Sequence, residues 1–204
     1  MAPHVRDIRG QMFMTIARFA HANRPIDGWY FEFGSYSATT MRLAYDAFHH
    51  LFDWDYVAFD SFEGMPEPQG DDRQEIWRPG MSSMSEAEFR AVCVQHGVPD
   101  ERLTTIAGWY RDTLTPETAA RFDARPAAVV YVDCDLYEST VPVLDFVGPF
   151  LQRGTVIVFD DWFCFYGDPE LGERRAFAEF RERNPELRFE PLWGNGEGQS
   201  FICL

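Results

Sequence analysis

The feature that most constrains the fold is the run from Ala127 to Val132, in which six apolar residues are followed directly by Asp133. A short run that is apolar at nearly every position is typical of a strand buried on both faces of a parallel sheet. Three other short runs also end in an acid, at Glu32, Asp60 and Asp160. A chain with this pattern is expected to form an α/β fold.

The predicted elements alternate along the chain. Strands are predicted at 28–34, 56–60, 103–106, 127–133, 155–160, 187–192 and 199–203, and helices at 5–21, 39–51, 85–97, 139–151 and 173–183. This alternation predicts a doubly wound, mostly parallel sheet of seven strands in a three-layer α/β/α arrangement. The length fits a single domain over 1–204, with an N-terminal helix within 1–27. In such sheets a ligand binds beyond the carboxyl ends of the strands.

The charge balance argues against two classes of function. The chain has 18 Lys and Arg residues against 33 Asp and Glu residues, a formal net charge of −15. Nucleic-acid binding requires a basic face, and binding to an anionic membrane surface requires basic clusters. The sequence also offers no long apolar span and no secretory h-region. We therefore expect a cytoplasmic protein that binds neither nucleic acid nor membrane.

One long segment, 61–85, has little periodicity and several prolines and glycines, among them Pro66, Pro68 and Pro79. Loops of this length inside a compact domain are usually functional, so we expect 64–85 to act as a lid. Ser85 and Glu88 have the spacing of a capping box, which predicts that the next helix begins there.

The turn after the first strand, Glu32-Phe33-Gly34-Ser35, can approach a ligand closely because glycine has no Cβ. It holds one glycine where a dinucleotide fingerprint holds three, so pyrophosphate binding is poorly supported. Asp60 follows Gly34 by 26 residues (60 − 34), a position suited to the hydroxyls of a ribose. Phe62 is either an apolar wall for adenine or part of the loop packing. An ordinary turn and an ordinary cap remain the alternatives for these motifs.

Two acidic clusters follow the fourth and fifth predicted strands, at Asp133 and Asp135 and at Asp160 and Asp161. Neighbouring strand ends lie about 5 Å apart, and carboxylates gathered there repel one another unless a proton or a cation intervenes. Oxygen ligands favour Mg²⁺, Mn²⁺ or Ca²⁺. We predict that Asp133, Asp160 and Asp161 hold a divalent metal. Asp135 belongs to the same acidic cluster, but its alternative role is to cap the helix that begins near residue 139.

Taken together, these motifs resemble the macrocin O-methyltransferase family, which comprises metal-dependent class I methyltransferases that use S-adenosylmethionine. The matching segments are EFGSYSATT at 32–40, FDSFEGMPE at 59–67, AGWYRDTL at 107–114, VDCDLYEST at 132–140 and VFDDW at 158–162. The resemblance implies the Rossmann-like fold of class I methyltransferases. The chain departs from the family at Ala38, where relatives usually have glycine, and in its short N-terminus.

The resemblance also implies roles for individual residues. The cofactor-binding residues it implies are Glu32, Gly34, Ser35, Asp60, Ser61, Phe62 and Asp133. The metal ligands it implies are Asp133, Asp160 and Asp161, with Mg²⁺ as the favoured ion. We expect Asp133 to accept the proton of the acceptor as well, because it sits nearest the expected methyl group.

The expected function is S-adenosylmethionine-dependent O-methylation of a small-molecule acceptor, a sugar hydroxyl or another diol of a natural product, with metal assistance. A homodimer is left open. Two other classes also stay open. In a nucleotide-sugar glycosyltransferase, Asp133 and Asp135 would hold a metal and a diphosphate, but the second acid pair argues against this. A non-catalytic S-adenosylmethionine-binding module is opposed by the complete acid trio.

Overall fold

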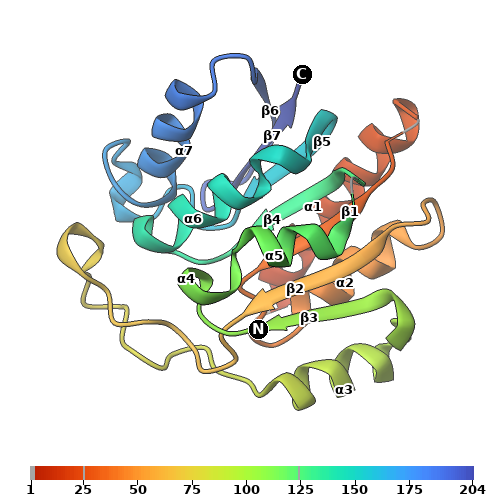
Figure 1. Ribbon diagram of the computed structural model, residues 1–204, viewed down its shortest axis with the longest axis horizontal. Helices are drawn as coiled ribbons and strands as arrows, with labels where there is room; N and C mark the ends of the chain where they lie inside the picture. Colours follow the sequence, from red (N-terminus) through yellow and green to blue (C-terminus); the bar gives the residue numbers. More distant parts are fainter. Residues whose placement is uncertain (1–2, 25, 124) are drawn as a thin grey trace.

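The computed structural model describes residues 3–24, 26–123 and 125–204, which form a seven-stranded sheet in the order β3-β2-β1-β4-β5-β7-β6 (Figure 1). Strands β1 to β5 are parallel, whereas β7 runs antiparallel to both β5 and β6. This confirms the predicted doubly wound, mostly parallel sheet. The strands are β1 (Trp29–Phe33), β2 (Asp55–Asp60), β3 (Leu103–Ala107), β4 (Ala127–Val132), β5 (Leu151–Phe159), β6 (Phe189–Gly194) and β7 (Gln199–Cys203).

Helices cover both faces of the sheet, and the alternation of side chains along each strand divides the core in two. In β4, Val129 and Tyr131 pack toward α1, α2 and α3, whereas Val130 and Val132 pack toward α6 and α7. Successive side chains of a strand point to opposite faces, so a strand that is apolar throughout serves both cores. The main helices are α1 (Pro3–Ala22), α2 (Thr39–Phe48), α3 (Glu86–His96), α6 (Tyr137–Val147) and α7 (Gly172–Arg183).

Short helices complete the structure and include two that the periodicity did not indicate. The elements α4 (Tyr110–Thr113) and α5 (Pro116–Ala119) are single turns after β3, too short to show a pattern. The 3₁₀ turns are η1 (Gly70–Asp72), η2 (Asp100–Arg102), η3 (Ala120–Phe122), η4 (Gly148–Phe150) and η5 (Phe165–Gly167). The capping box that begins α3 is present as predicted. Within the described residues, no helix combines the length and apolar character needed to cross a membrane.

The sheet brings the ends of β1, β2, β4 and β5 to one edge. In the register of the sheet, Phe33 of β1 lies opposite Phe59 of β2 and Val132 of β4, and Val132 lies opposite Phe159 of β5. The chain order reverses between β1 and β4, which is the point where doubly wound sheets bind ligands. The 61–85 loop extends beyond this edge, drawn in yellow in Figure 1.

Candidate functional site

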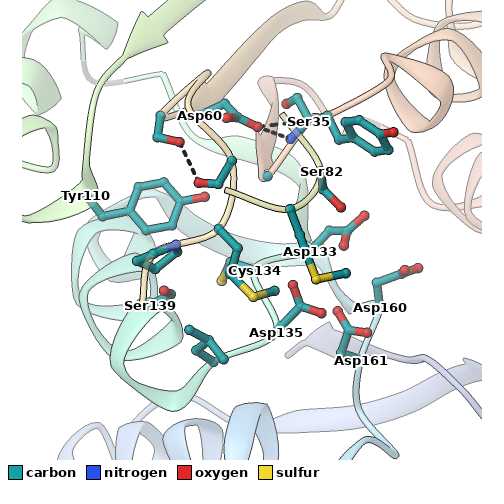
Figure 2. Close-up of a pocket in the computed structure, with 18 of the residues that line it drawn as sticks. Ser35, Asp60, Ser82, Tyr110, Asp133, Cys134, Asp135, Ser139, Asp160 and Asp161 are labelled. Atoms are coloured by element: carbon teal, nitrogen blue, oxygen red, sulfur yellow. Dashed lines mark hydrogen bonds between the residues drawn. The ribbon is translucent and has the colours of Figure 1, made fainter. Parts of the chain in front are cut away.

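A cavity of about 590 Å³ opens at the carboxyl ends of the strands, a volume within the usual range for a small-molecule site. Figure 2 shows Ser35 and Asp60 on one side and the carboxylates of the β4 and β5 ends on the other. The residues predicted from the sequence that line the cavity are Gly34, Ser35, Asp60, Ser61, Asp133, Asp160 and Asp161. The two other predicted site residues, Glu32 and Phe62, do not line this cavity.

Asp60 ties the turn after β1 to the loop after β2. Its carboxylate accepts hydrogen bonds from the backbone N–H groups of Ser35 at 2.6 Å, Tyr36 at 3.2 Å and Phe62 at 2.7 Å. The Ser35 hydroxyl is buried and finds no hydrogen-bond partner among the described residues. A carboxylate can accept about four hydrogen bonds, so Asp60 retains capacity for one further donor.

The glycine of this turn has a structural reason that the sequence does not reveal. Gly34 adopts a φ of +85°, and a Cβ at this position would overlap the carbonyl oxygen of Asp133. Ala38, at the start of α2, adopts a left-handed φ of +56°. Glycine reaches that conformation without strain, so the resemblance's expectation of glycine at this position has a physical reason.

Glu32 lies beneath the turn and is fully buried. Its carboxylate accepts hydrogen bonds from the Tyr30 hydroxyl at 2.6 Å and the Thr40 hydroxyl at 3.0 Å. Burial raises the pKa of Glu32 to about 7, although these hydrogen bonds oppose the rise. Glu32 therefore links β1 to α2 and supports the turn from below. Phe62 packs its ring against Phe89 of α3, with a centroid distance of 5.6 Å, as the loop-packing alternative expects.

The acids at the ends of β4 and β5 form a compact cluster. Asp133, Asp135 and Asp161 each place one carboxylate oxygen within 4.8 Å of the others. Burial and neighbouring carboxylates raise the pKa of Asp133 and Asp161 well above the ordinary value, and burial together with Asp133 raises the pKa of Asp135 to about 7. Carboxylates this close repel one another when all are ionised.

Asp160 makes different contacts from the other acids. Its carboxylate accepts hydrogen bonds from the Arg9 guanidinium, with Nε to Oδ1 at 3.1 Å, and from the hydroxyl of Tyr131. The structure thus brings two of the three predicted metal ligands, Asp133 and Asp161, into one group. It adds Asp135 to that group. The third predicted ligand, Asp160, is instead paired with Arg9 of α1.

The alternative role of Asp135, capping the following helix, is wrong. Asp135 adopts a φ of +58° and directs its carboxylate into the acid cluster. The first free N–H groups of α6, those of Tyr137 and Glu138, instead donate to the buried carboxylate of Asp72 at 2.9 and 3.0 Å. A residue of the 61–85 loop therefore fills the capping position, which leaves Asp135 free to join the cluster.

Three residues near the site lie outside the motifs. Arg9 comes from α1, Trp77 from the 61–85 loop, and Glu173 from the first turn of α7. Trp77 packs against Phe165 with ring centroids 4.8 Å apart, and Glu173 accepts a hydrogen bond from the Asp161 backbone N–H at 3.1 Å. No spacing rule marks these positions. Only Trp77 has a sequence signal, because a tryptophan within a polar loop suggests that it packs against another segment.

The acid cluster fits a hard divalent cation. Its donors are all carboxylate oxygens, which Mg²⁺, Mn²⁺ and Ca²⁺ prefer. Asp161 Oδ2 is buried and has no hydrogen-bond partner in the described part of the chain. A buried, unpaired carboxylate oxygen is destabilising unless a proton or a cation compensates it. The donor set and this free oxygen therefore agree with the predicted metal site.

Comparison with known proteins finds similarity to O-methyltransferases. The model of the macrocin-O-methyltransferase (TylF) family matches residues 22–187. The 8-demethyl-8-(2,3-dimethoxy-alpha-L-rhamnosyl)-tetracenomycin-C 4'-O-methyltransferase of Streptomyces olivaceus is 34% identical over 109 residues, 50% of this chain and 40% of that protein. The demethyldecarbamoylnovobiocin O-methyltransferase of Streptomyces niveus is 31% identical over 120 residues, 56% of this chain and 44% of that protein. The chain thus spans less than half the length of these relatives.

Solved structures show the same fold. The O-methyltransferase NovP superposes with a TM-score of 0.77 at 24% identity, covering 95% of this chain and 78% of that one. The calicheamicin methyltransferase CalS11 superposes with a TM-score of 0.76 at 22% identity, covering 99% and 80%. The similarity covers nearly the whole chain, as expected for the Rossmann-like class I fold.

Proposed function

The chain belongs to the macrocin-O-methyltransferase family, and from that premise we propose that it transfers the methyl group of S-adenosylmethionine to a hydroxyl of a sugar or another diol on a small natural product. The family match agrees with the resemblance drawn from the motifs. The observation that supports this function best is a single cavity in which the Gly34 turn and Asp60 face the acid cluster. A donor site and an acceptor-activating site then share one space.

We assign the cofactor to the side of the cavity formed by Gly34, Ser35 and Asp60, with Ser61 beside them. Asp60 has capacity for one more hydrogen bond, which suits a ribose hydroxyl. The unpartnered Ser35 hydroxyl offers a further polar contact within this turn. Glu32 contributes by holding the turn in place and Phe62 by packing the adjoining loop.

We assign a divalent metal, with Mg²⁺ as the favoured ion, to the acid cluster. Asp133 and Asp161 are selected both by the sequence and by the geometry, and Asp135 supplies a third oxygen in the observed arrangement. The assignment of Asp160 as a ligand remains a prediction, because its carboxylate is bonded to Arg9 in this structure. When bound, such an ion lowers the pKa of an acceptor hydroxyl.

The protein's own residues orient the reactants and move one proton. Asp133 takes the proton of the acceptor hydroxyl as the hydroxyl oxygen forms its bond to the methyl carbon. The bond from that carbon to the sulfonium breaks, and S-adenosylhomocysteine leaves. Holding the oxygen in line with the methyl group supplies much of the rate. The 64–85 segment excludes water, since Asp72 and Trp77 fasten it to α6 and to Phe165.

The test is methyl transfer from labelled S-adenosylmethionine to a panel of glycosides and catechols, with Mg²⁺ or with EDTA. We expect labelled product from a neutral glycoside that carries a free diol, and loss of turnover in EDTA and in Asp133→Asn. Asp145→Asn, an exposed aspartate of α6, is the matched control. Binding of S-adenosylhomocysteine without turnover on any acceptor would favour a binding module. Full activity in EDTA would remove the metal from the mechanism.

A further inference from the structure

Glu173 is a buried acid that neither the motifs nor the cavity lining includes. Its side chain belongs to the first turn of α7, and the residue is 1% exposed. One carboxylate oxygen, Oε2, accepts the hydrogen bond from the Asp161 backbone N–H at 3.1 Å. The other, Oε1, is buried and has no partner among the residues that the structure describes.

The strongest charges that act on Glu173 from the described residues are negative. They are the carboxylates of Asp161, Asp135, Asp160 and Asp133. Asp161 Oδ2 is likewise buried and has no hydrogen-bond partner within the described residues. Two adjacent carboxylates with one free oxygen each are destabilising unless a cation or a proton compensates them.

The basic side chains nearest α7 and the cluster already have partners. Arg174 donates to the carbonyl oxygen of Gly167, Arg175 pairs with Glu179, and Arg9 pairs with Asp160. None of these three side chains contacts the free oxygen of Glu173, which leaves a proton or a bound cation to compensate its charge. The all-oxygen cluster next to Glu173 is suited to a divalent ion.

We propose that Glu173 is a positioning residue of the divalent-ion site, which holds the Asp161 main chain in place and adds a fourth negative charge behind the three cluster carboxylates. The proposal rests on the metal assignment in the proposed function. Groups that orient metal ligands from behind typically change metal affinity by about 10–100-fold when they are removed. The same range is expected here.

The rival explanation is a proton shared between Glu173 and Asp161. Glutamine distinguishes the two, because Glu173→Gln keeps the size of the side chain and can still accept from the Asp161 N–H. Its amide is neutral and can donate a hydrogen bond, as a protonated glutamic acid can. If Glu173 is neutral in the folded protein, this substitution leaves metal affinity intact. If Glu173 acts through its charge, the substitution weakens metal binding.

The experiment measures free Mn²⁺ by electron paramagnetic resonance during titration of the full chain, with saturating S-adenosylhomocysteine. We expect Glu173→Gln to raise the Mn²⁺ dissociation constant about 10–100-fold, while calorimetry finds S-adenosylhomocysteine affinity unchanged. Glu170→Gln, three residues earlier and exposed, is the matched control and should stay within about twofold of the unmodified protein. Glu173→Asp keeps the charge and should recover most of the lost affinity.

Each outcome decides a different point. Mn²⁺ affinity of Glu173→Gln within about twofold of the unmodified protein would overturn the inference in favour of the shared proton. Equal loss in Glu173→Asp and Glu173→Gln would also overturn it, since charge would then not be the cause. If Glu173→Gln fails to fold, the Mn²⁺ titration of Glu173→Asp decides alone. A Mn²⁺ affinity of Glu173→Asp as low as that of Asp161→Asn, a variant of the cluster itself, contradicts the proposal. Absence of Mn²⁺ binding by the unmodified protein would overturn the metal assignment itself.

Discussion

Glu32→Gln should remove a pH-dependent component of stability that the structure locates in one buried carboxyl. Glu32 is fully buried between β1 and α2, and its pKa of about 7 stands against an ordinary value of 4.5. Each pKa unit corresponds to about 1.4 kcal/mol. Ionised Glu32 therefore lowers the free energy of unfolding by about 3 kcal/mol relative to the protonated form.

The sign follows from proton linkage. The folded state binds the Glu32 proton more tightly than the unfolded chain does, so its contribution is fully present below about pH 4.5 and is lost as the pH rises through about 7. Glutamine stays neutral throughout this window. We expect the variant and the unmodified protein to differ by less than about 1 kcal/mol at pH 5, and the variant to be about 2–3 kcal/mol the more stable at pH 8.

The assay is urea unfolding followed by tryptophan fluorescence between pH 5 and pH 8, in EDTA. The acid cluster adds its own pH dependence to both proteins, so the informative quantity is the difference between their unfolding free energies. Glu182→Gln, an exposed position on α7, is the control and should show a constant difference. A Glu32→Gln difference that stays constant from pH 5 to pH 8, or that moves in favour of glutamate, would refute the reasoning.

Three further substitutions test separate parts of the account. Asp60→Ala removes a side chain that accepts from three N–H groups and should weaken S-adenosylhomocysteine binding about 10–100-fold by calorimetry. Unchanged affinity would contradict the cofactor assignment. Asp72→Ala removes the cap of α6 and should cost about 1 kcal/mol, or about 2–4 °C in Tm; an unchanged Tm would speak against that role. Asp160→Asn leaves Arg9 largely buried without its counter-charge and should cost about 3 kcal/mol in urea unfolding, well above the cost of Asp161→Asn; the opposite order would show that the ion pair does not stabilise the fold.

The fold could be predicted because its signals are local. The β4 run is apolar at six consecutive positions, and such a run is satisfied only when both faces of the strand are covered. Acids that directly follow parallel strands must meet at one edge, which placed Asp60, Asp133 and Asp160 around one cavity. The boundaries of helices and strands depend on weaker signals. Leu151 was expected to end a helix and instead begins β5, because an apolar residue suits either element.

The fine geometry of the site could not be predicted because it depends on contacts between distant segments. The pairing of Asp160 with Arg9 joins positions separated by 151 residues, and the cap on α6 comes from a loop more than 60 residues upstream. A local rule assigns that cap to the nearest acid, Asp135, and it fails when a distant carboxylate reaches the same N–H groups. Glu173 shows the same limit, since its importance lies in the Asp161 N–H that it accepts.

We propose that carboxylates from the ends of β4 and β5 hold a divalent ion beside the bound methyl donor. The most direct test is a crystal structure with S-adenosylhomocysteine and Mn²⁺, with anomalous diffraction measured at the manganese edge. We expect one strong anomalous peak between the carboxylates of Asp133 and Asp161, and the sulfur of the cofactor product facing it from the Gly34 turn. A peak away from both aspartates, or S-adenosylhomocysteine bound outside this cavity, would contradict it.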